Sequence, residues 1–168
     1  MKKIGIFYGK ETVKTASIAN KIQELFGESE TKMVPVEEAW EKEFEAYDNL
    51  IVGGATWFDG ELPNYWDIII PELKSLSLKG KRIAIFGLGD QVNYSENFVD
   101  SIGLLAKAFL EAGAMIVGQT SPEGYSFSQS LALKDGKLQG LAIDEDNQPE
   151  KTNKRISNWV TQLKKEFQ

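Results

Sequence analysis

The sequence contains no cysteine and no histidine. Without cysteine, the chain cannot form a disulfide or use a thiolate nucleophile. Without histidine, it has no Ser-His-Asp triad, no Cys/His zinc site and no imidazole for acid-base chemistry near neutral pH. Any chemistry must therefore use carboxylates, hydroxyls, lysines or a bound cofactor.

Long hydrophobic runs are also absent. No apolar run approaches the roughly 20 residues that span a bilayer, and "MKKIGIFYG" has the pattern of a first strand rather than a signal peptide. We therefore expect a cytoplasmic location. The 168 residues, 42% hydrophobic and 26% charged, predict one globular domain over residues 1–168. The net charge of −6 argues against nucleic acid or an anionic membrane as partner, and fits either a solvated acidic surface or docking to basic proteins.

Short apolar runs alternate with helical patterns along the chain. Strands are expected at 3–8, 31–36, 49–57, 82–90 and 114–118. Helical patterns occupy 15–26, 37–47, 63–76, 97–113 and 155–167, with Pro71 interrupting the third. This alternation predicts an α/β fold, a doubly wound five-stranded parallel sheet in the order 2-1-3-4-5 with helices on both faces. Residues 119–143 lack a helical pattern, and their Asp135-Gly136 pair predicts a hairpin-like insertion in the region of the last strand.

Ligands of open α/β sheets bind beyond the carboxyl ends of the strands. Three loops leave such ends here, at 9–15, 55–61 and 87–97. The first carries Thr12 and Thr15 with Lys10 and Lys14 at a helix start, which suits an oxyanion, although helix capping by a threonine is the commoner role of a lone hydroxyl there. Neither G-x-x-x-x-G-K-[ST] nor G-x-G-x-x-G occurs, which excludes the usual nucleotide and dinucleotide loops.

The other two loops each carry an exposed aromatic candidate. Trp57 and Tyr94 can flank a flat heteroaromatic ligand, or each can pack onto its own loop. Beside a phosphate loop, the pair favours a planar ligand that bears a phosphate. The acidic run 144–147 lacks EF-hand spacing, so no metal is expected. "GGATW" has no aspartate at the end of the third strand, which argues against a phosphorylatable receiver domain.

The segments "GGATWFDGELPNYWD", "FGLGDQVNYSENFVDSIG" and "GLAIDEDNQPEKTNKRISNWVTQLKKEF" resemble the corresponding segments of long-chain flavodoxins, and the resemblance extends along nearly the whole chain. It implies a flavodoxin-like fold and a low-potential one-electron carrier with non-covalently bound FMN. It further implies a monomer that is not an enzyme. Its partners would be redox proteins, flavodoxin or ferredoxin reductases and acceptor oxidoreductases, which dock transiently on an acidic face, with no role for nucleic acid or membrane.

The resemblance also implies site residues. Thr12, Thr15 and the N–H groups from Lys10 to Thr15 would bind the FMN phosphate. Trp57 and Tyr94 would sandwich the flavin ring, and the Phe58–Asp59 peptide would present a carbonyl to flavin N5. The pyrimidine edge would meet Leu88, Gly89 and Asp90. The complete expected set is Lys10, Glu11, Thr12, Val13, Lys14, Thr15, Thr56, Trp57, Phe58, Asp59, Gly60, Leu88, Gly89, Asp90, Tyr94, Asn97, Val99 and Asp146, the last-named three lining the ring or the ribityl chain.

Three positions depart from the family pattern. Lys10 stands where Ser or Thr is usual, Val13 where Gly is usual, and neither 58 nor 59 is glycine. We hypothesise that Lys10 or Lys14 partly neutralises the phosphate, and that a strained peptide flip at 58–59 leaves the one-electron-reduced flavin less stabilised. Two alternatives stay open: a flavodoxin-fold interaction or regulatory domain that has weakened or lost FMN binding, and a flavin-dependent quinone reductase, for which a two-electron site and a tight dimer would be expected.

Overall fold

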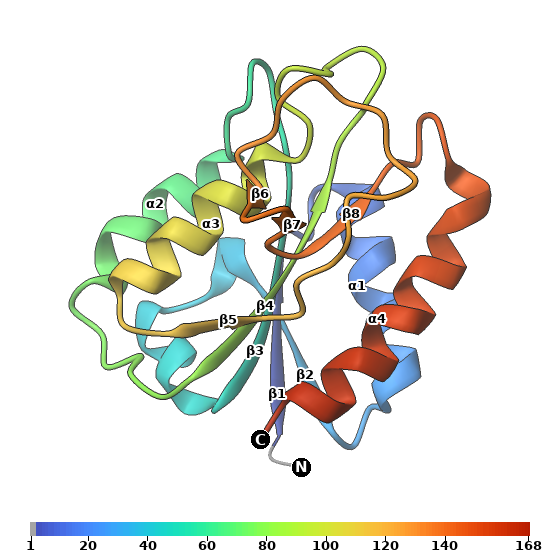
Figure 1. The fold of residues 1–168 in the computed structure, drawn as a ribbon. Coiled ribbons are helices and arrows are strands. Elements are labelled where there is room, and N and C mark those ends of the chain that lie inside the picture. The colour runs from blue at the N-terminus through green and yellow to red at the C-terminus, as the bar shows by residue number, and fades with distance from the viewer. Residues whose placement is uncertain (1–2) are drawn as a thin grey trace.

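The computed structural model describes residues 3–168, and a parallel sheet forms its centre (Figure 1). The strands are β1 (Ile4–Tyr8), β2 (Thr31–Pro35), β3 (Asn49–Ala55), β4 (Arg82–Leu88) and β5 (Met115–Val117). Their order is β2-β1-β3-β4-β5, which confirms the predicted topology. Every residue of β3 is buried, as expected of a central strand covered on both faces.

Two short strands share the last position of the sheet. β5 pairs with Arg82–Ala84 at the start of β4, and β8 (Leu141–Ile143) pairs with Phe86–Leu88 at its end, both in parallel. The chain between them contains the antiparallel hairpin of β6 (Leu133–Lys134) and β7 (Lys137–Leu138). Asp135 and Gly136 form its turn with φ of 53° and 79°, the left-handed geometry that an Asp-Gly turn requires. The predicted insertion is confirmed, whereas β8 was not predicted as a strand of the main sheet.

Helices cover both faces of the sheet, as predicted. α1 (Val13–Phe26) and α4 (Thr152–Glu166) lie together on one face, and α2 (Asn64–Leu73) and α3 (Asp100–Glu111) lie on the other (Figure 1). The first pair packs through Ile18, Ile22 and Trp159, and the second through Trp66 and Phe109, all of them buried. The spacing of apolar residues along each helix therefore corresponds to its buried face.

The structure differs from the expected helices in three places. The predicted helix over 37–47 is wrong: two 3-10 helices, η1 (Val36–Glu38) and η2 (Glu41–Ala46), stand there, because Phe44 is the single buried side chain of η2 and no apolar helical face exists. Pro71 lies inside α2, which continues two residues further. α3 begins at Asp100 rather than at 97, because Val99 has a left-handed φ of 46°. The 3-10 helix η3 (Pro149–Lys151) leads into α4.

No helix within residues 3–168 is both long and apolar enough to cross a bilayer.

Candidate functional site

A cavity of about 590 Å³ lies where the three predicted loops meet, beyond the carboxyl ends of β1, β3 and β4. This is the edge at which open α/β sheets bind ligands. Its lining combines residues of all three loops and one residue that follows β8: Thr12, Val13, Lys14, Ala55, Thr56, Trp57, Leu88, Gly89, Asp90, Asn93, Tyr94 and Asp146. The structure thus brings together most of the predicted site residues. Ala55 and Asn93 were missed, since neither small side chain signals a ligand by its type.

The first loop holds unpaired donors beside this cavity, which Thr12, Val13 and Lys14 line and Thr15 does not. Thr12 occupies the N-cap position of α1, but its side chain makes no capping hydrogen bond. The first helical hydrogen bond runs from Ala16 N to Thr12 O at 3.0 Å, so the N–H groups of Val13, Lys14 and Thr15 have no acceptor within the helix. Thr15 is fully buried, and its Oγ1 has no hydrogen-bond partner among the described residues. Capping therefore does not explain either threonine, and the donor set fits an oxyanion.

The two lysines of this loop point to different places. The backbone N–H groups of Lys10 and Glu11 donate to the carboxylate of Glu37 at 3.1 and 3.2 Å, and the Lys10 ammonium pairs with Glu38. Lys14 lines the cavity, with its Nζ 3.1 Å from Asp146 Oδ1. Lys10 and Glu11 are thus turned toward η1 and are not brought to the cavity. Of the two lysines in our hypothesis, only Lys14 stands where it can neutralise an anion.

Val13 fits the loop without strain. It is the first residue of α1, is 80% exposed, and is not among the described residues with positive φ. The turn does not demand the left-handed conformation that would require glycine, so a β-branched residue is tolerated there.

Gly9 is required for a reason that the sequence did not reveal. A Cβ at Gly9 would lie 2.0 Å from the hydroxyl oxygen of Tyr65, whose ring covers the end of β1. Burial raises the pKa of Tyr65 to about 12, so this hydroxyl stays neutral. The glycine therefore allows α2 to pack against the first loop.

The Trp57 loop is a tight turn closed by its own backbone. Trp57 and Glu61 exchange two N–H···O hydrogen bonds of 2.7 Å each. Phe58 has a left-handed φ of 49° and Gly60 a φ of 90°, so Phe58, Asp59 and Gly60 form the tip and do not line the cavity. Trp57 remains 36% exposed, with its ring at the cavity.

Two contacts anchor this turn to the start of α3. Thr56 Oγ1 donates to Ser101 Oγ at 3.0 Å and accepts from Ser101 N at 3.1 Å. At Gly60, a Cβ would lie 2.6 Å from Asp100 Oδ2 and 2.9 Å from Asn97 Nδ2, so only glycine fits. Asn97 thus packs against Gly60 of the Trp57 turn and does not line the cavity.

In the third loop, a hydrogen-bonded aspartate stands next to an exposed aromatic ring. Tyr94 is 51% exposed at the cavity. The Asp90 carboxylate accepts from the N–H groups of Val92 and Asn93 at 3.0 and 2.9 Å, and from the Asn93 and Asn147 side chains at 2.8 Å each. Burial alone would raise the pKa of Asp90, but the hydrogen bonds from Asn93 and Asn147 outweigh it and lower the pKa. Val99, by contrast, is fully buried in the core beneath α3.

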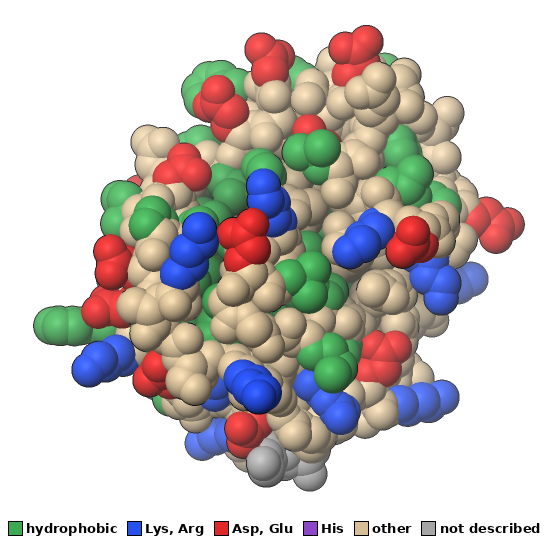
Figure 2. Space-filling view, turned by 60° about the vertical axis from the view of Figure 1, so that its left-hand side comes forward, with side chains coloured by type: hydrophobic (Ala, Val, Ile, Leu, Met, Phe, Trp, Pro, Cys, Tyr) green, Lys and Arg blue, Asp and Glu red, His purple; other side chains and the backbone are tan. Residues whose placement is uncertain are grey.

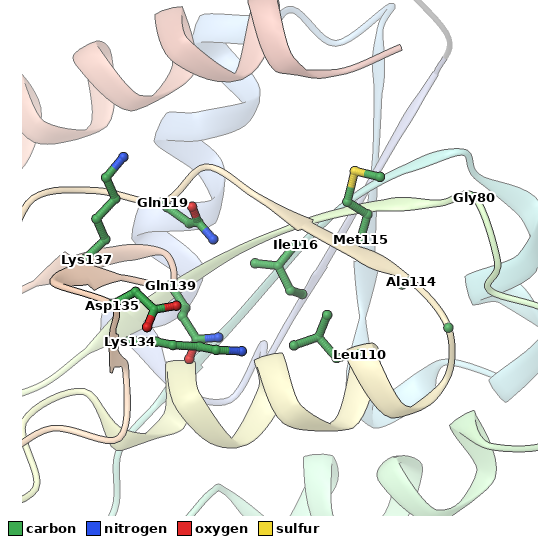
Figure 3. Close-up of a pocket in the computed structure, with 11 residues that line it drawn as sticks. Gly80, Leu110, Ala114, Met115, Ile116, Gln119, Lys134, Asp135, Lys137 and Gln139 are labelled. Carbon is green, nitrogen blue, oxygen red and sulfur yellow. The ribbon is translucent and has the colours of Figure 1, made fainter.

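A second hollow lies away from these loops. It encloses about 520 Å³ between the edge strand β5 and the β6–β7 hairpin. Met115 and Ile116 line it on the strand side, Lys134 and Lys137 on the hairpin side, and Leu110 from α3 (Figure 3). None of the predicted site residues lines it. Figure 2 shows acidic side chains but no basic ones along the top of the face in view, and acidic, basic and hydrophobic side chains mixed below. Within residues 3–168, no group of three or more acidic side chains could hold a metal ion.

The sheet order and the three-loop cavity define a flavodoxin-type α/β protein. The chain belongs to the flavodoxin family, since the sequence profile of that family, described as flavodoxin, matches residues 6–159. It is 46% identical to a flavodoxin of Synechococcus elongatus over 168 residues, covering 99% of each chain. It is 40% identical to one of Klebsiella pneumoniae, covering 98% of this chain and 94% of that one. The crystal structure of Fusobacterium nucleatum flavodoxin bound to flavin mononucleotide matches with a TM-score of 0.94 and 34% identity, covering 100% of both chains.

Proposed function

We propose that this protein is a one-electron carrier that binds FMN non-covalently in the three-loop cavity and exchanges electrons with other redox proteins. The observation that carries the proposal is the buried Thr15 Oγ1, which has no partner among residues 3–168, beside the N–H groups of the first turn of α1, which have no acceptor within the helix. A phosphate monoester supplies the acceptors that this set of donors lacks. The FMN-bound relative from Fusobacterium nucleatum supports the same cofactor.

Within this proposal, each part of the cavity has one task. Thr12, Thr15 and the N–H groups from Thr12 to Thr15 hold the phosphate, with the Lys14 ammonium nearby. The rings of Trp57 and Tyr94 flank the flavin and exclude water from its two faces. FMN supplies the redox chemistry, and the chain sets its orientation and electrostatic surroundings.

The acidic residues near the cavity have an electrostatic task. Asp90 and Asp146 line the cavity, and Asp59 and Glu61 lie on the Trp57 turn. Their negative charge disfavours further negative charge on a nearby ring, which keeps the reduction potential low. We further propose that basic redox partners dock transiently over this edge, and that the protein works as a cytoplasmic monomer. Transient redox encounters bury small interfaces and depend on charge steering.

The alternative of an interaction domain without FMN is less well supported. It rested on the altered phosphate loop, yet Val13 takes a helical conformation and Lys10 lies outside the cavity. A quinone reductase is not favoured either, because the relatives named above are flavodoxins.

Titration of apoprotein tests the proposal. FMN and riboflavin are added separately at low salt, and quenching of flavin fluorescence gives each dissociation constant. We expect a yellow complex, much tighter with FMN than with riboflavin, whose visible absorbance dithionite bleaches. Colourless protein that takes up no FMN would support the interaction-domain alternative, and equal affinities for the two flavins would refute the phosphate site.

A further inference from the structure

A fully buried aspartate lies directly behind the Tyr94 loop. Asp144 follows β8, whose last residue pairs with Leu88 at the end of β4. Ile143 O accepts a hydrogen bond of 3.0 Å from Gly89 N, so Asp144 leaves the sheet beside the start of that loop. Its exposure is 0%, and none of the ion pairs recorded for residues 3–168 includes it. A buried carboxylate without a cation persists only when N–H or O–H donors surround it.

Amide donors from two loops surround this carboxylate. Gln91 gives its backbone N–H and its side-chain Nε2–H to Oδ2, at 3.1 and 2.7 Å. Asn147 gives its backbone N–H to Oδ1 at 3.0 Å, and its Nδ2 lies 2.9 Å from Oδ2. One carboxylate therefore fixes both backbone and side chain at Gln91, the residue next to Asp90.

The network continues to the cavity and to the insertion. Asn147 Nδ2 also donates to Asp90 Oδ1 at 2.8 Å, and Gln91 Oε1 accepts from Ser126 N at 2.6 Å. Asp90 lines the cavity. A single buried group thus connects β8, the insertion and the wall of the cavity, although the acidic run in which it lies appeared uninformative in the sequence.

We propose that Asp144 is a positioning residue for the flavin-ring side of the cavity, and that it acts through Gln91 and through Asn147 on Asp90. The inference rests on the proposed function and deepens it. An amide at position 144 leaves a single acceptor oxygen and turns an N–H₂ group toward N–H donors, so the loop loses its fixed position. Because the network holds the ring side and not the phosphate side, its loss weakens FMN and riboflavin equally.

The test titrates apoprotein of the wild type and of Asp144→Asn with FMN and with riboflavin, and records the visible circular dichroism of each bound flavin. We expect both affinities to fall by about 10-fold, with the FMN-to-riboflavin ratio unchanged and an altered dichroism of the bound ring. Asp135→Asn makes the same chemical change in the β6–β7 turn and should leave both affinities as in the wild type.

A double variant separates positioning from simple loss of stability. In D144N/Q91E the carboxylate and the amide exchange places, so the side-chain hydrogen bond between positions 91 and 144 re-forms with reversed direction while the glutamate still accepts from Ser126 N. The backbone N–H of residue 91 and Asn147 Nδ2, which both donate to Asp144 Oδ2 in the wild type, still lose that acceptor. We therefore expect the double variant to recover part of the lost affinity and to shift the dichroism back toward the wild type. If D144N does not fold, Asn147→Ala, at an exposed position, should give the same parallel loss for both flavins.

Wild-type affinities and an unchanged dichroism in D144N, or in N147A where D144N does not fold, would overturn the inference and leave the proposed function standing. A loss confined to FMN would overturn it too, because the network would then serve the phosphate side. A wild-type apoprotein that binds neither flavin would overturn the proposed function itself, and this inference with it.

Discussion

Thr15→Val removes a single hydroxyl from the phosphate side of the cavity and keeps the shape of the side chain. The Thr15 side chain is fully buried, and its Oγ1 lacks a partner in the described structure. In the proposed complex this hydroxyl donates to the FMN phosphate. The substitution should therefore have opposite effects on the apoprotein and on the complex.

The magnitudes follow from the two environments. A buried hydroxyl without a partner lowers the stability of the folded state by about 1–3 kcal/mol. Because Thr and Val have similar helix propensities, the free energy of unfolding of the T15V apoprotein should rise by about 1 kcal/mol. A hydrogen bond to a charged group contributes about 1.5–3 kcal/mol. Its loss should weaken FMN binding by about 10- to 150-fold. Riboflavin has no phosphate, so its affinity should not change.

Urea unfolding of apoprotein and fluorescence titrations with both flavins measure these three quantities. Thr161→Val is the matched control, because Thr161 Oγ1 donates to Ser157 O on the exposed side of α4 and Thr161 does not line the cavity. It should leave the affinities for both flavins unchanged. A lower free energy of unfolding in T15V, with FMN and riboflavin weakened alike, would show that Thr15 stabilises the helix start and would refute the reasoning.

Three further predictions concern the turn, the charge and the glycine of the site. Asp59→Gly should relieve the strain of the peptide next to Phe58 and increase the fraction of one-electron-reduced flavin at half reduction, read from its long-wavelength absorbance; an unchanged fraction would contradict this. Folding lowers the pKa of Asp90, so its carboxylate stabilises the fold above the unfolded pKa of about 3.9, and this contribution is lost as the pH falls through the lower, folded pKa. The difference in unfolding free energy between the wild type and Asp90→Asn should therefore shrink on acidification, and a difference that stays constant with pH would refute the assignment. Gly9→Ala places a methyl group 2.0 Å from the Tyr65 hydroxyl and should lower the melting temperature, whereas adding Tyr65→Ala should remove the incremental effect of the Gly9 change; a melting temperature equal to that of the wild type would show that the contact relaxes freely.

The sheet and its order could be read from the sequence because parallel strands with both faces covered leave long apolar runs. β3 and β4 are such runs, and each is followed by a loop whose place depends on the strand order alone. Trp57 and Tyr94 could therefore be assigned to one edge before any coordinates. Short strands give no such signal, and for that reason β8 was not distinguished within the insertion.

The sequence also did not predict the contacts of residues whose partners lie far away in the chain. Lys10 faces Glu38, and Gly9 faces Tyr65, across separations that no local pattern encodes. The run of Asp144 to Asn147 was considered only as a possible metal site, yet Asp144 is buried and Asn147 donates a hydrogen bond to Asp90. The type of each side chain shows which hydrogen bonds it can donate or accept, but not which partner the fold brings to it.

The sequence by itself determined the fold class, the edge of the sheet that carries the site and the chemical character of its three loops. These follow from periodicity and side-chain chemistry, which are properties of the chain. Tertiary structure alone decided which donors remain free. Thr15 Oγ1 has no partner in the part of the chain that the structure describes, whereas the N–H groups of Lys10 and Glu11 donate to Glu37. Whether a polar group is free depends on which neighbours packing brings within hydrogen-bond distance.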